Sequence, residues 1–137
     1  MAAAFAAGLD VVRPVKPATI AKSLAIGNPA DGPYALDAVR ASGGSFGSVT
    51  DEEIVAGIRL LARTEGIFAE TAGGVTIATL AQLAASGVVR PDERVVAYVT
   101  GTGLKTLEAV APDCRPTATI APTLDAFAAA VDIPEVP

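Results

Sequence analysis

Histidine is missing from this 137-residue sequence, and its absence restricts the chemistry that the chain can perform. Histidine is the commonest general base near neutral pH and the commonest protein ligand of transition metals. A Ser-His-Asp or Cys-His mechanism within this chain is therefore excluded. A zinc site is disfavoured for the same reason, and we predict no metal site.

Cysteine occurs once, at Cys114, in the polar stretch Asp113-Cys114-Arg115-Pro116. One cysteine cannot form a disulfide within the chain, so a reducing compartment is favoured and we predict a cytoplasmic protein. No histidine or second cysteine is available to activate the thiol. We therefore interpret Cys114 as a bystander.

Basic runs and long apolar runs are also lacking. The ten Lys and Arg are dispersed and the formal net charge is −5, so the chain has no basic surface to neutralise the phosphates of a nucleic acid. No stretch reaches the ~18 consecutive apolar residues of a membrane span. The apolar start, Met1–Gly8, is short and has no basic leader, so we do not interpret it as a signal peptide. We predict no nucleic-acid and no membrane partner.

Aromatic residues make up 4% of the chain, but hydrophobic residues make up 51%, which suits one compact folded domain. Apolar periodicity and turn residues predict helices over 34–41, 51–65, 75–86 and 123–131, and short strands over 45–49 and 94–100. Residues 95–99 are nearly all apolar, which is typical of a parallel strand covered on both faces. The alternation predicts an α/β fold with a partial, open, mostly parallel sheet and flanking helices.

The clearest local pattern is a capping box at Thr50-Asp51-Glu52-Glu53. Thr50 is placed to accept a hydrogen bond from the backbone N–H of Glu53, whose side chain can in turn accept from the backbone N–H of Thr50. The acidic residues also suit the positive end of a helix dipole. We therefore expect a helix to begin directly after Thr50.

Three glycine-containing segments are candidates for a binding site. The first, Val99-Thr100-Gly101-Thr102-Gly103-Leu104-Lys105, lies at the carboxyl end of the predicted strand 94–100, and ligands of open parallel sheets bind beyond the carboxyl ends of the strands. The others are Glu70-Thr71-Ala72-Gly73-Gly74, where small residues open a helix, and Gly27-Asn28-Pro29. Each also has a plain structural interpretation: a strand-to-helix turn, a solvated helix start and a helix stop. An unrelated nucleotide-binding loop is a further alternative, although no third glycine completes Gly-x-Gly-x-x-Gly.

Five blocks of the sequence belong together when taken in order: Thr19–Pro29, Ser42–Gly44 with Asp51–Ile54, Leu61–Phe68, Glu70–Gly74 and Val99–Lys105. Together they resemble the threonine synthase family over roughly residues 5–130. The resemblance implies a two-domain α/β fold built around pyridoxal phosphate (PLP), of fold type II. It further implies conversion of O-phospho-L-homoserine and water to L-threonine and phosphate. Sister enzymes of the same fold, such as threonine dehydratase or cysteine synthase, are the alternatives.

The resemblance also implies roles for individual residues. Thr100 matches the position whose hydroxyl hydrogen-bonds the pyridine nitrogen of PLP, and Gly101, Thr102 and Gly103 shape the loop beside the ring. Glu70, Thr71 and Ala72 match a Glu-Pro-Ala-type segment near the cofactor, with Thr71 where many relatives have proline, so the local backbone is in doubt there. Asn28 matches a Gly-Asn-Pro turn in the vicinity of the substrate.

The family's other active-site segments have no counterpart here. Lys16, Lys22 and Lys105 are the lysines of the sequence, and none lies in the Ser-Phe-Lys-Asp-type context of the lysine that attaches PLP. The glycine-rich loop for the PLP phosphate is also missing. We therefore expect residues 1–137 to be a single partial domain, the C-terminal part of the large PLP-binding domain, with no catalytic residue of its own and no activity in isolation. Its expected partner is a second copy, as in the family's homodimers, or a separate N-terminal half. A non-catalytic binding or regulatory module is the alternative.

Overall fold

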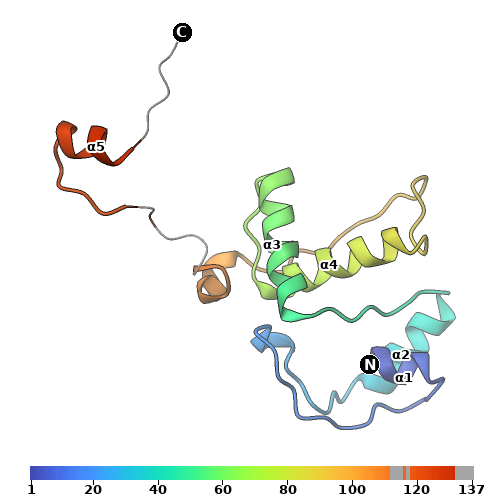
Figure 1. The fold of residues 1–137 in the computed structure, drawn as a ribbon. Coiled ribbons are helices and arrows are strands. Elements are labelled where there is room, and N and C mark those ends of the chain that lie inside the picture. Colours follow the sequence, from blue (N-terminus) through green and yellow to red (C-terminus); the bar gives the residue numbers. More distant parts are fainter. Residues whose placement is uncertain (112–115, 117, 132–137) are drawn as a thin grey trace.

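A computed structural model describes residues 1–111, 116 and 118–131; Cys114 lies outside the described residues. Figure 1 shows helices joined by long irregular segments. The elements in chain order are α1 (Ala2–Ala6), the 3-10 helix η1 (Lys22–Leu24), α2 (Gly32–Ala41), α3 (Asp51–Glu65), α4 (Thr71–Ala85), the 3-10 helix η2 (Gly103–Ala109) and α5 (Leu124–Ala130). None of the helices in this described part is long and apolar enough to cross a membrane.

The predicted parallel sheet is not confirmed, because the described residues contain no strand. Segments 45–49 and 94–100 are irregular in the structure, and the β contact that is present is an isolated antiparallel bridge between Ala69 and Thr102. A strand is held by hydrogen bonds to a neighbouring strand, and no described segment pairs with 94–100. The strands predicted over 45–49 and 94–100 are therefore not found among the described residues, and residues 95–99 are exposed rather than buried. The described part of the molecule is helical.

The capping box is confirmed at the start of α3. The Thr50 hydroxyl accepts a hydrogen bond from the backbone N–H of Glu53 at 3.2 Å, and Glu53 Oε2 accepts from the backbone N–H of Thr50 at 2.7 Å. These bonds favour the ionised carboxylate, so the Thr50 backbone N–H, followed by the Gln82 amide, lowers the pKa of Glu53. The helix ends at Gly66, which adopts the left-handed conformation with φ 69°.

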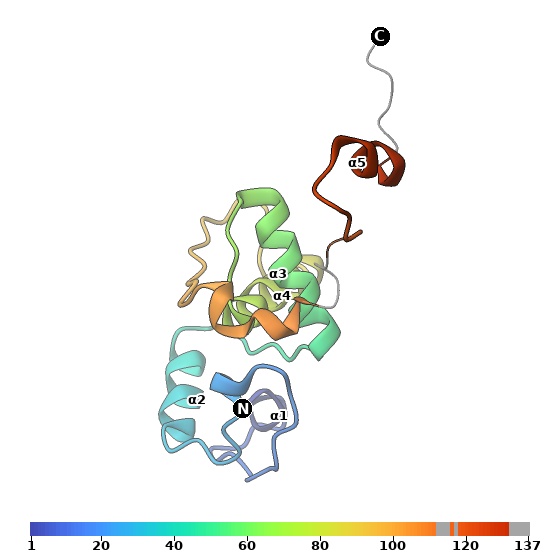
Figure 2. The same cartoon turned by 90° about the vertical axis from the view of Figure 1, so that its left-hand side faces the viewer.

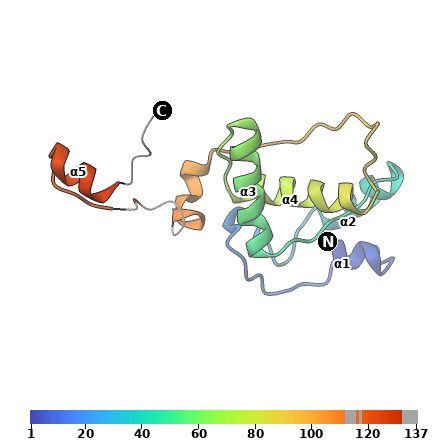
Figure 3. The ribbon, with the colours of Figure 1, turned by 45° about the horizontal axis from the view of Figure 1, so that its top comes forward.

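Helices α3 and α4 form the packed centre of the molecule, and Figures 2 and 3 show them crossing in contact. Their backbones meet at two glycines: a Cβ on Gly57 would lie 2.5 Å from the Gly74 carbonyl oxygen, and one on Gly74 would lie 2.6 Å from the Ile54 carbonyl oxygen. The Gln82 amide of α4 also donates to Glu53 Oε1 of α3 at 3.0 Å. The buried core cluster lies against this crossing and comprises Ala21, Ile54, Ile58 and Val110.

The N-terminal part is connected to α3 through the carboxylate of Asp51. Oδ1 of Asp51 accepts a hydrogen bond from the Thr19 hydroxyl at 2.6 Å, and both of its oxygens accept from the backbone N–H of Ile20 at 3.2 Å. Because Asp51 lies in the first turn of α3, the charge also suits the helix dipole. This contact brings Thr19 and Ile20, at the start of the first resemblance block, against the start of α3.

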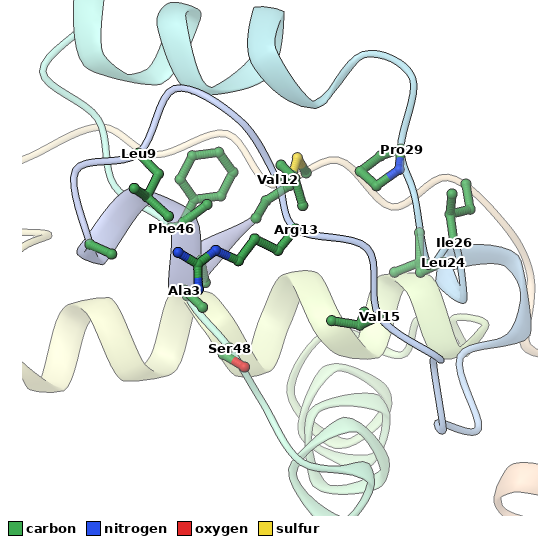
Figure 4. Close-up of a pocket in the computed structure, with 16 residues that line it drawn as sticks. Ala3, Leu9, Val12, Arg13, Val15, Leu24, Ile26, Pro29, Phe46 and Ser48 are labelled. Atoms are coloured by element: carbon green, nitrogen blue, oxygen red, sulfur yellow. The ribbon is translucent and has the colours of Figure 1, made fainter.

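Two cavities border segment 45–48. The larger, of about 920 Å³, is mostly apolar. Figure 4 shows the side chains around it, among them Leu9, Val12, Ile26 and Phe46. The smaller, of about 430 Å³, lies between residues 45–47, one side of α4 and residues 95–97. Helix α5 lies apart from α3 and α4 in all three ribbon views.

Candidate functional site

Two of the candidate segments meet in the structure, although they are about 30 residues apart in sequence. The backbone N–H of Glu70 donates to the Gly101 carbonyl at 3.0 Å, and the N–H of Gly103 donates to the Phe68 carbonyl at 2.9 Å. These two bonds flank the isolated bridge between Ala69 and Thr102. The loop 100–103 is thereby joined to the residues that lead into α4.

Glu70 lies behind this loop and does not face solvent. Its side chain is 5% exposed and forms an ion pair with Lys105, whose Nζ lies 2.9 Å from Oε2 and whose side chain is 59% exposed. The carboxylate packs directly against Gly101, since a Cβ at that position would lie 2.5 Å from Glu70 Cδ and would overlap Oε1. A side chain at position 101 is therefore excluded by Glu70, while the φ of Gly101 is not in the left-handed region.

Thr71 begins α4 and is completely buried. Its backbone N–H donates to the hydroxyl of Thr106 at 3.1 Å, whereas its own buried hydroxyl has no hydrogen-bond partner among the described residues. Ala72, the next residue, is half-buried. Thr71 therefore contributes to the support of the site from within, and Ala72 lies nearer to its surface.

The outer side of the site is formed by the two threonines of the loop. Thr100 and Thr102 are both exposed, and neither hydroxyl makes a hydrogen bond within the described part of the chain. Gly103 is buried against the ring of Phe68, where a Cβ would lie 2.5 Å from two ring atoms. The loop thus presents two available hydroxyl groups from a backbone that is fixed on its inner side.

Asn28 is not brought to this site by any described contact. It is exposed in a bend between Gly27 and Pro29, both of which line the larger cavity. The geometry therefore defines a cluster of Glu70–Ala72 with Thr100–Gly103, and it places Asn28 elsewhere on the described surface.

Sequence reasoning missed three members of the cluster. Lys105 pairs with Glu70, Thr106 accepts from Thr71, and the Phe68 ring supports Gly103. Lys105 and Thr106 follow the glycine loop directly, so their position in the sequence was the available indication of their place. No group of metal-ligating side chains is present among the described residues.

Comparison with known proteins identifies the family of the chain. Residues 1–101 match the profile of the pyridoxal-phosphate dependent enzyme family. The match covers more than half of the chain, and the chain therefore belongs to this family. PLP is the cofactor of the family, and the matched region contains Glu70–Ala72 and Thr100.

Among individual proteins, the chain is similar to threonine synthases, which confirms the resemblance. It is 50% identical over 96 residues to the threonine synthase of Methanocaldococcus jannaschii, covering 70% of this chain and 24% of that enzyme. It is 40% identical over 129 residues to the threonine synthase of Methanosarcina acetivorans, covering 93% of this chain and 32% of that enzyme. The threonine synthase of Halalkalibacterium halodurans is 48% identical over 90 residues. The chain spans about a quarter to a third of the length of these relatives.

Proposed function

We propose that this chain forms the pyridine-ring side of a threonine synthase active site, as the C-terminal part of the large domain. The complete enzyme would convert O-phospho-L-homoserine and water to L-threonine and phosphate. The observation that carries the proposal is the exposed, unbonded hydroxyl of Thr100, on a loop fixed to the start of α4. Thr100 belongs to a chain that is 50% identical, over 96 residues, to a threonine synthase.

The accessible and the buried residues of the cluster would have different tasks. PLP, when bound, supplies an electron sink for proton removal at the substrate carbons. The Thr100 hydroxyl would donate to the pyridine nitrogen and, because a hydroxyl is a weak acid, would leave that nitrogen largely unprotonated. Gly101, Thr102 and Ala72 would border the ring, whereas the buried Glu70, Thr71 and Gly103 would hold the loop from behind.

The lysine that attaches PLP and the loop that binds its phosphate would come from a complementary N-terminal portion. Residues 95–99 are suited to contact it, because Val96 and Tyr98 are 75% and 78% exposed and no backbone group of this segment has a described partner. An exposed apolar segment with unpaired backbone is a template for another strand. We infer pairing of this kind, within one chain, with a separate chain or across a homodimer. A cytoplasmic location remains a prediction.

A chimeric enzyme tests the proposed function. The segment of the Methanocaldococcus jannaschii enzyme that corresponds to this chain would be replaced by the present sequence, and phosphate release from O-phospho-L-homoserine would be measured. We expect an active chimera that loses PLP affinity and activity on Thr100→Ala. Thr100→Ser, which retains the hydroxyl, should keep most of both.

Thr79→Ser is the matched control, because it alters a threonine of α4 that lines the smaller cavity. A folded chimera that binds PLP but acts on another amino-acid substrate would favour a sister enzyme such as threonine dehydratase or cysteine synthase. A folded chimera that neither binds PLP nor turns over would refute the proposal and favour a binding or regulatory module. Asn28→Ala should raise KM for phosphohomoserine if the substrate lies near this turn in the assembled enzyme.

A further inference from the structure

We propose that Lys105 and Glu70 are positioning residues, and that their ion pair is a latch that holds the loop 100–103 in its binding conformation. The inference rests on the proposed function, because the latch would act on the cofactor through Thr100. Neither residue would touch the reacting atoms. Lys105 thereby receives a role that its sequence context did not indicate.

The ion pair of Lys105 with Glu70 lies against the backbone of the loop 100–103. Lys105 Nζ lies 2.9 Å from Glu70 Oε2, and a Cβ on Gly101 would lie 3.1 Å from the same ammonium group and 2.5 Å from Glu70 Cδ. The pair therefore lies directly against the loop backbone, one residue after Thr100. Movement of either side chain changes what the loop packs on.

The two side chains of the ion pair differ in burial. The Glu70 side chain is 5% exposed, whereas the Lys105 side chain is 59% exposed. A nearly buried carboxylate requires a partner because it has lost most of its hydration, while an exposed ammonium group does not. Within the described residues, Lys105 is the ion-pair partner of Glu70. Loss of Lys105 would therefore drive Glu70 toward solvent and away from Gly101.

Three hydrogen bonds donated by backbone N–H groups lie beside the ion pair. Glu70 N–H bonds to the Gly101 carbonyl, Gly103 N–H bonds to the Phe68 carbonyl, and Thr71 N–H bonds to the Thr106 hydroxyl. All three join the segment 68–71 to the segment 101–106. If Glu70 rotates outward, its own N–H bond to Gly101 is the first to be strained. The ion pair and the three bonds form one cooperative unit.

Amide hydrogen exchange on the chain as it stands tests the latch without any cofactor. In Lys105→Met we expect the amides of Glu70 and Gly103 to exchange at least about tenfold faster than in the wild type. Lys105→Arg, which keeps the charge, should restore slow exchange. Lys22→Met is the matched control, because Lys22 is an exposed lysine that forms no ion pair within the described part of the chain.

The amides of α3 provide the internal reference for these measurements. A rise in the amide exchange rate that is confined to residues 68–71 and 101–106 in Lys105→Met, and that is absent in Lys105→Arg, supports the latch. Unchanged exchange in Lys105→Met overturns it. A rise of equal size throughout α3 also overturns it, because the mutation would then weaken the whole fold rather than the loop. If the chimera with the wild-type sequence fails to bind PLP, the proposed function is contradicted. The hydrogen-exchange evidence that the ion pair holds the loop is not affected by that failure.

Discussion

Replacing Gly101 by alanine tests how closely the loop packs on Glu70. The new Cβ would lie 2.5 Å from Glu70 Cδ, and real Cβ atoms essentially never come within 3.0 Å of another heavy atom. The carboxyl group must therefore retreat by about half an ångström or more, or the loop must move outward. Overpacking of this kind typically costs about 1–3 kcal/mol. Since the φ of Gly101 is not in the left-handed region, the whole cost is steric.

The free energy of unfolding would be measured by urea denaturation in four proteins: wild type, Gly101→Ala, Glu70→Ala and the double variant. Removal of the Glu70 carboxyl group clears the space for the Cβ, and the remaining neighbour is the flexible end of Lys105 at 3.1 Å. We expect Gly101→Ala to lower the free energy of unfolding by about 1–3 kcal/mol in the wild-type background and by less than about 0.5 kcal/mol with Glu70→Ala. Equal costs in both backgrounds would refute the steric argument.

The remaining predictions concern the helices that support the site. Thr50→Ala should lower the free energy of unfolding in urea by about 0.5–2 kcal/mol through loss of the α3 cap, and the exposed Thr64→Ala by less. Because the pKa of Glu53 is lowered in the fold, its contribution is complete above the unfolded-state pKa and is lost as the pH falls through the folded-state pKa. The stability difference between wild type and Glu53→Gln should therefore shrink in thermal melts taken at increasingly acidic pH. Gly74→Ala should cost about 1–3 kcal/mol because its Cβ would meet the Ile54 carbonyl oxygen, as measured by urea denaturation. Ile58→Ala should cost about 2–5 kcal/mol in the same assay by leaving a cavity in the core, and a cost below about 1 kcal/mol would contradict the burial seen here.

A helix end could be predicted from local sequence where capping or terminating residues mark it. The start of α3 followed from Thr50 and Glu53, and its end from Gly66. The start of α4 was predicted at Val75 but lies at Thr71. The first turn of α4 contains Gly73 and Gly74, where a Cβ would lie 2.7 Å from Ala69 Cβ and 2.6 Å from the Ile54 carbonyl oxygen, so close packing rather than apolar periodicity accounts for this turn.

The sheet was predicted but is not found among the described residues, and the ion pair of Lys105 with Glu70 was not predicted. Both outcomes have one cause, because strand pairing and this ion pair depend on partners distant in sequence. The apolar pattern of residues 95–99 gave the kind of surface a strand has, but a strand also needs a neighbour to accept its hydrogen bonds. The glycines of 101–103 marked this loop as a candidate binding loop, which stays a prediction. No periodicity relates Lys105 to Glu70, and their pairing follows from the packing of α4 against η2.

Segment 94–100 is continuous from the smaller cavity, which residues 95–97 line, to the hydroxyl of Thr100. Whatever polypeptide orders the first part of this segment also restricts the position of the second. In the proposed enzyme, binding of that polypeptide and binding of PLP would then be thermodynamically linked. Each would strengthen the other by the same factor. In the proposed enzyme, the affinity for PLP would therefore reach its full value only when the polypeptide that orders residues 95–97 is in place.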